Sequence, residues 1–147
     1  MNDLKMKETV CECKDCVEMC RWRPCLGTPT DLERIVDAGL TKRLMLDWWV
    51  GGGKNGDDIL ILSPAVKGRE TGRAAELIPT GECTFLTKDG KCELHGLGLK
   101  PSEGRIADCK KEKQDGLHKK VAMTWNNDGA QDFAKRVYAN RFAANQG

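Results

Sequence analysis

The chain of 147 residues carries 24 basic and 22 acidic side chains, a net charge of +2 and 5% aromatic residues. This length predicts a single domain over residues 1–147, and the nearly balanced charge argues against a dedicated nucleic-acid-binding protein. With 16 glycines and a mean hydropathy of −0.53, the core is expected to be modest. Such a domain gains stability from cross-links, which its eight cysteines can supply.

The N-terminus is charged and lacks the apolar core of a signal peptide, and no stretch approaches the ~18 apolar residues of a membrane span. We therefore expect a cytoplasmic protein with no membrane segment. Thiols stay reduced in that compartment, so clustered cysteines there indicate metal binding more often than disulfides. Structural disulfides and a reactive thiol remain as alternatives.

The first element along the chain is a cysteine-rich segment, Cys11 to Cys25, which holds five of the eight cysteines. Cys13 and Cys16 have the C-x2-C spacing with which two thiolates bind one ion. Cys20 follows one helical turn after Cys16, so a short helix would direct both sulfurs at the same centre. Two arginines near Cys25 make it the candidate for a reactive thiol.

Two helices are predicted after this segment. Thr28 is a typical N-cap and Gly39 a typical residue beyond a helix end, which predicts a helix between them. From Thr41, apolar residues at helical spacing predict a second helix, with Trp48 and Trp49 on its buried face. The alternative for this tryptophan pair is a stacking platform for bases or another ligand.

The middle of the chain is rich in turns. Residues 51–58 (GGGKNGDD) predict a loop, and residues 59–62 (ILIL) predict a short buried strand. Residues 83–95 contain two short apolar runs on either side of an Asp-Gly pair, which favours a tight hairpin turn. Because Cys83 begins one run and Cys92 the other, a β-hairpin would hold two thiolates close together.

The C-terminal part predicts an amphipathic helix over about residues 128–143. Its apolar face is expected to pack on the domain and contains Phe133, Val137, Tyr138 and Phe142. His118 lies in a polar run before this helix and is expected at the surface.

A second group of potential ligands lies far from the first. Cys83, Cys92 and Cys109 can each supply a thiolate, and His95 lies three residues after Cys92. An imidazole there suits zinc, although His95 could instead be hydrogen-bonded within the hairpin. Tetrahedral zinc sites commonly take ligands from two separated segments, and binding then closes the intervening loop.

The order of these motifs resembles the YkgJ-type cysteine-cluster proteins. These are described as zinc- or iron-chelating domains and also occur as a segment of flagellin lysine N-methylases. The resemblance covers about residues 11–110, where Met19 stands in place of one family cysteine and Cys11 and Cys25 are additional. The motifs that carry it are the knuckle Cys13-Lys-Asp-Cys16 with Cys20, the run Thr28-Pro-Thr-Asp31-Leu-Glu-Arg34-Ile35, Cys83-Thr-Phe85-Leu86, Asp89-Gly90-Lys91-Cys92-Glu-Leu94-His95, Lys100-Pro101 and Cys109.

The resemblance implies a set of metal ligands and a fold. The first choice of ligands is Cys13, Cys16, Cys20, Cys83, Cys92 and Cys109, and the second is Cys11, Cys25 and His95. This exceeds one tetrahedral site, so either two ions share the set or some thiols are not ligands. Zn2+ is the expected metal, with iron or an iron–sulfur cluster as the alternative. The expected fold class is α+β: a small cysteine-rich metal-binding domain with short helices around a β-hairpin and little regular sheet.

The predicted function is metal binding by this cysteine cluster, in which the metal holds the fold and a surface for a protein partner. One alternative, suggested by the methylase relatives, is an iron–sulfur redox or methyltransferase-accessory protein. Another is a nucleic-acid-binding zinc protein that uses Trp48, Trp49 and the mildly basic C-terminal third. The sequence has no dinucleotide fingerprint, nucleophile elbow or H-E-x-x-H helix, which argues against an enzyme.

Overall fold

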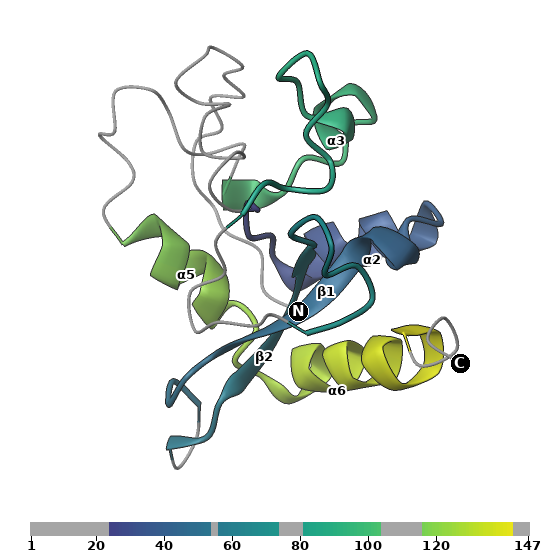
Figure 1. Ribbon diagram of the computed structural model, residues 1–147. Helices are drawn as coiled ribbons and strands as arrows, with labels where there is room; N and C mark the ends of the chain where they lie inside the picture. Colours follow the sequence, from purple (N-terminus) through teal and green to yellow (C-terminus); the bar gives the residue numbers. More distant parts are fainter. Residues whose placement is uncertain (1–23, 54–55, 74–80, 104–115, 143–147) are drawn as a thin grey trace.

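The computed structural model describes residues 24–53, 56–73, 81–103 and 116–142, apart from the side chains of 141 and 142. This part of the chain is mixed α+β with one antiparallel strand pair, which confirms the predicted class (Figure 1). Its elements in chain order are α2 (Pro29–Asp37), the 3-10 helix η1 (Thr41–Arg43), β1 (Leu44–Trp49), β2 (Ile59–Pro64), α3 (Glu93–Gly96), α5 (Leu117–Met123), α6 (Asp128–Val137) and the π-helical turn η3 (Tyr138–Phe142).

Helix α2 begins and ends as the sequence predicts. The Thr28 hydroxyl accepts a hydrogen bond from the Asp31 N–H at 3.3 Å, and the Asp31 carboxylate accepts one from the Thr28 N–H at 2.9 Å. This reciprocal pair satisfies donors that a helix start leaves open. Beyond the other end, Gly39 has a φ of 82°, which ends the helix in the left-handed conformation. Leu32 and Ile35 are fully buried and hold α2 on the core.

The second predicted helix is wrong beyond its first turn. Only Thr41–Arg43 are helical, and Leu44–Trp49 form β1, which pairs antiparallel with β2. The strand at 59–62 is confirmed as part of β2, and residues 51–53 and 56–58 belong to neither strand, in line with the predicted loop. Four consecutive residues of β1 are buried, so both of its faces are covered. A strand buried on both faces has no alternating polar pattern, and its apolar residues match a helical spacing equally well.

Trp48 and Trp49 therefore do not share a face, because successive strand residues point to opposite sides. Both are half-buried. Trp49 packs against the main core, whereas Trp48 packs against the small cluster of Met45 and Ala65 and lies beneath the guanidinium of Arg73. The packing role that was predicted for them agrees with the structure, although the common face does not.

The C-terminal helix packs on the domain as predicted, against β2. Ala130, Phe133, Ala134 and Val137 of α6 are buried, and the helix lies along β2 (Figure 1). The Gln131 side chain accepts a hydrogen bond from the Leu60 N–H and donates one to the Leu60 carbonyl, both at 3.0 Å. This amide therefore satisfies the backbone of β2 on the side away from β1. The end differs from the prediction, because a π-helical turn replaces the last part of the helix.

One hydrophobic core joins the strand pair, the helices and residues 83–94. Trp125 and Phe85 are its largest members and are fully buried. The indole N–H of Trp125 donates to the Gly27 carbonyl at 2.8 Å, which ties the N-terminal end of the described chain to the core. None of the helices in the described ranges has the length and apolar character needed to cross a bilayer.

Candidate metal centre

The predicted ligands fall into two groups. Cys25, Cys83, Cys92 and His95 lie within the described residues. The others lie outside them: Cys11, Cys13, Cys16, Cys20 and Cys109.

Residues 83–95 form the predicted tight turn but neither of the two predicted strands, since Cys83 and Leu86 make only isolated bridges, to Val66 and Cys92. Leu86 and Cys92 form an antiparallel bridge, and the Thr87 N–H donates to the Lys91 carbonyl at 2.8 Å. Gly90 has a φ of 76°, which the turn requires and glycine permits. After Cys92 the chain enters α3 instead of a strand, because one helical turn places Leu94 in the core, where it is 1% exposed.

Leu86 connects the two cysteines of this turn. Its N–H donates to the Cys83 carbonyl at 3.0 Å, and its backbone pairs with Cys92. Cys83 is buried at 4% exposure, and Cys92 is half-buried against the same core. Two thiols that arise from one short turn suit a shared ion, as the spacing predicts.

His95 follows on α3, where it is half-buried and its N–H donates to the Cys92 carbonyl at 3.1 Å. Within the described residues, no group of three or more cysteine, histidine, aspartate or glutamate side chains could hold a metal ion. Cys83, Cys92 and His95 therefore do not complete a site by themselves. A full thiolate site needs cysteines from outside the described residues.

Cys25 is buried in the core at 6% exposure, and the residues after it are held against the segment that leads to Cys109. The Leu26 carbonyl accepts a hydrogen bond from the Glu103 N–H at 3.0 Å, and the Leu26 N–H donates to the Glu103 carboxylate at 3.1 Å. We call this pair of bonds the Leu26–Glu103 clamp. Cys20 lies six residues before Leu26, and Cys109 lies six residues after Glu103.

Asp31 joins the same two segments at a second point. Its carboxylate is 6% exposed and accepts hydrogen bonds from the Thr28 N–H, from the Ser102 N–H at 2.9 Å and from the Ser102 hydroxyl. A charged acceptor that serves several buried donors makes strong hydrogen bonds. The chain just after the N-terminal cysteines is thus fixed beside residues 102–103.

The sequence did not single out Glu103 or its contact with His118. The Glu103 side chain is 2% exposed, and its Oε2 lies 2.7 Å from His118 Nδ1. The imidazole is 41% exposed, so its predicted place at the surface is correct in part, and its ring lies 5.7 Å from that of Trp49. A glutamate within a polar run gives no sign of burial, and its partners are far away in the sequence.

A buried carboxyl group lies near this pair, on β1. Asp47 is 8% exposed. Burial raises its pKa from the ordinary value of 3.8 to about 6, although the Trp48 N–H at 2.7 Å and the charge of His118 act to lower it. The folded protein therefore holds the Asp47 proton more tightly than the unfolded chain does.

We expect Asp47→Asn to stabilise the protein above pH 6 and to have little effect near pH 4. Well below pH 4 the carboxyl group is protonated in both the folded and the unfolded state and costs no stability. As the pH rises from about 4 through about 6, the unfolded chain loses this proton more readily, and the folded protein loses stability. The two pKa values correspond to a difference of about 3 kcal/mol at pH 7.5. Urea unfolding of both proteins at the two pH values measures it, with Asp57→Asn at an exposed position as the control. Equal stability of Asp47→Asn and wild type at pH 7.5 would contradict the raised pKa.

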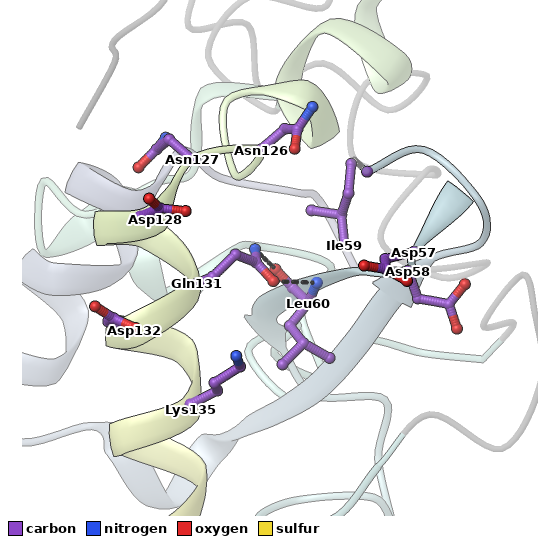
Figure 2. Close-up of a pocket in the computed structure, with 11 residues that line it drawn as sticks. Asp57, Asp58, Ile59, Leu60, Asn126, Asn127, Asp128, Gln131, Asp132 and Lys135 are labelled. Atoms are coloured by element: carbon purple, nitrogen blue, oxygen red, sulfur yellow. Dashed lines mark hydrogen bonds between the residues drawn. The ribbon is translucent and has the colours of Figure 1, made fainter. Parts of the chain in front are cut away.

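An open groove lies between the start of β2 and helix α6 (Figure 2). Its volume is about 680 Å³, and it is lined by Asp57 and Asp58 at the start of β2 and by Asp128 and Asp132 of α6. The hydrogen bonds of Gln131 to Leu60 cross its floor. No cysteine lines the groove, so it is separate from the Cys83–Cys92 turn.

No family model matches the chain, and no curated protein or solved structure is similar to it at a significant level. The resemblance to the YkgJ-type proteins therefore stays a prediction from the motifs. The case for a metal centre rests on the contacts described above.

Proposed function

We propose that this protein binds Zn2+ through thiolates of its two cysteine-rich segments, and that the metal holds the fold and a surface for a protein partner. The observation that carries the proposal is the Leu26–Glu103 clamp. It brings the end of the N-terminal segment together with the segment that leads to Cys109.

The clamp limits how far apart the flanking cysteines can lie. Six residues span at most about 20 Å even when fully extended. Cys20 therefore lies within this distance of Leu26, and Cys109 lies within the same distance of Glu103. Any turn in either segment shortens this reach. The two segments are therefore suited to supply ligands to a common centre.

The Cys83–Cys92 turn supplies the second part of the proposal. Cys83, Cys92 and Leu26 all pack in or against the same hydrophobic core. Thiolates favour borderline-soft ions such as zinc, and a closed set of four suits a structural site. Four of the six first-choice cysteines would complete one such site. The remaining cysteines and His95 are candidates for a second ion.

The alternatives differ in what the described residues support. An iron–sulfur centre would use the same thiolates and stays the main alternative, with redox or methyltransferase-accessory roles. The nucleic-acid alternative is weakened, because Trp48 and Trp49 do not form a common stacking face. A cytoplasmic location remains part of the proposal, since thiols stay reduced and available as ligands in that compartment.

Alkylation after chelation tests the proposal. Freshly purified protein, prepared without oxygen, is treated with a strong chelator and iodoacetamide in urea, without reductant, and the modified cysteines are mapped by mass spectrometry. We expect at least four to react on chelation, including Cys13, Cys16, Cys83 and Cys92, because the ion protects thiolates that were never oxidised.

The control is the same reaction with a reductant and no chelator. If the cysteines react only after reduction, they form disulfides and the proposal is wrong. Elemental analysis of the same sample identifies the metal. An iron–sulfur cluster would also absorb near ~400 nm, whereas zinc is colourless because its d shell is full.

A further inference from the structure

We propose that Arg43 is a positioning residue for the metal site. It holds the Cys83–Cys92 turn in the geometry that binds the ion. This inference rests on the proposed function. Arg43 is the last residue of η1 and directly precedes β1. It therefore connects the turn to the strand pair, which is the most regular part of the fold.

One guanidinium contacts the chain next to both thiols. Its Nη2 donates to the Thr84 carbonyl at 2.6 Å and forms an ion pair with the Glu93 carboxylate. Thr84 directly follows Cys83, and Glu93 directly follows Cys92. A shift of either cysteine relative to the other would break one of these contacts.

The guanidinium also lies over the ring of Phe85, with its carbon atom 4.2 Å from the ring centroid. Phe85 is fully buried, and its carbonyl accepts a hydrogen bond from the Glu93 N–H at 2.9 Å. The stacked guanidinium and this backbone bond therefore act on the same two sides of the Cys83–Cys92 turn. Such a cation–π contact stabilises the guanidinium in this position.

Thr84 is held from its other side as well. Its hydroxyl donates to Glu70 at 2.9 Å, while its carbonyl accepts from Arg43. Burial acts to raise the pKa of Glu70, but hydrogen bonds from Thr84 and from backbone groups, with the charge of Arg43, outweigh it and leave the pKa below its ordinary value. Glu70 is therefore ionised at neutral pH and strengthens this bond.

Only arginine meets all of these contacts. Its planar group can donate in two directions while its face stacks on an aromatic ring, whereas a lysine ammonium offers a point charge on a flexible stem. Rigid outer contacts around metal ligands typically account for a factor of 10–100 in metal affinity. The contribution of Arg43 should therefore appear in metal affinity and in the geometry of the bound ion.

The test compares Arg43→Gln with Arg69→Gln, an identical substitution at an exposed arginine. Zinc affinity is measured by competition with a coloured chelator. We expect a loss of about 10–100-fold for Arg43→Gln and less than about twofold for Arg69→Gln. Arg43→Lys should fall between them, because it keeps the charge opposite Glu93 but loses the stacked, two-directional contact.

Cobalt substitution separates positioning from general stability. Thiolate-bound Co2+ absorbs in bands that depend on ligand number and geometry, and these bands should change in Arg43→Gln. A lower melting temperature with unchanged cobalt bands and unchanged zinc affinity would show a purely structural role and overturn the inference. Glu93→Gln, at a residue whose side chain is 42% exposed, is the second variant if Arg43→Gln does not fold. It should weaken zinc binding in the same direction but less.

The two proposals can fail separately. If wild-type protein binds zinc through its cysteines and Arg43→Gln binds it as tightly as Arg69→Gln, only the role of Arg43 is overturned. If wild-type protein binds no zinc, or if replacing Cys92 leaves binding unchanged, the proposed function is overturned together with it.

Discussion

Removal of the proposed zinc ion from the reduced protein is expected to unfold much of the chain. Structural zinc contributes on the order of 10 kcal/mol to folding in small peptides. A typical domain has a total stability of only about 5–15 kcal/mol. Here the residues that pack in the core beside the clamp and the turn include Leu26, Phe85 and Leu94. Freeing both cysteine segments would therefore also release these side chains from the core.

Circular dichroism melts of metal-loaded and chelator-treated protein, both under reductant, measure this effect. Cys16→Ser and Cys92→Ser should each lose stoichiometric metal and melt like the chelated protein. Cys11→Ser is the matched control and should lose little, because the family pattern begins at Cys13. Identical melts before and after chelation would contradict a structural metal. If Cys11→Ser lost as much metal as Cys16→Ser, the assignment of ligands to the N-terminal cysteines would be wrong by one C-x2-C unit.

Asp31→Ala is expected to destabilise the metal-loaded protein by about 3–5 kcal/mol. The carboxylate caps α2 and accepts two further bonds from Ser102, so its loss leaves buried donors at both places without an acceptor. A lost cap costs about 1 kcal/mol, and each buried polar group left unsatisfied costs about 1–3 kcal/mol. The midpoint and slope of urea unfolding give the measured value.

Asp37→Ala is the control, because Asp37 is exposed at the other end of the same helix. Its effect should stay within about 0.5 kcal/mol. Ser102→Ala should give an intermediate loss, since it removes only the hydroxyl bond and leaves the backbone bond in place. If Asp31→Ala were no worse than Asp37→Ala, the link between α2 and residue 102 would contribute nothing to stability.

Local signals in the sequence predicted the parts of the fold that depend on neighbouring residues. The cap at Thr28, the glycine after α2 and the Asp-Gly turn before Cys92 are all set within a few residues. The strand β1 was missed because its identity depends on pairing with β2. Burial on both of its faces left no period that separates a strand from a helix.

The candidate site divides in the same way. The Asp-Gly pair predicted the tight turn between Cys83 and Cys92, which the structure confirms. The two strands predicted to hold these cysteines side by side do not form, and Cys83 bridges to Val66 instead. The contacts that fix this turn and the clamp join distant parts of the chain. Arg43 and Glu93 are separated by 50 positions in the sequence, and Leu26 and Glu103 by 77. Charged residues are mostly exposed in proteins, so the sequence gives no sign that Glu103 is buried or which distant residue Arg43 contacts.

The bond pattern of Gln131 has a consequence for synthesis of the chain on the ribosome. The outer edge of β1 is covered by residues 71–73, through a 2.9 Å bond from the Leu46 N–H to the Gly72 carbonyl. The outer edge of β2 has to wait for Gln131, which is made about seventy residues after Leu60. An open strand edge can pair with another chain. Until Gln131 is translated, the Leu60 backbone lacks the partner that the C-terminal helix supplies in the described structure, and this strand edge is open to pairing with a nascent chain on a neighbouring ribosome.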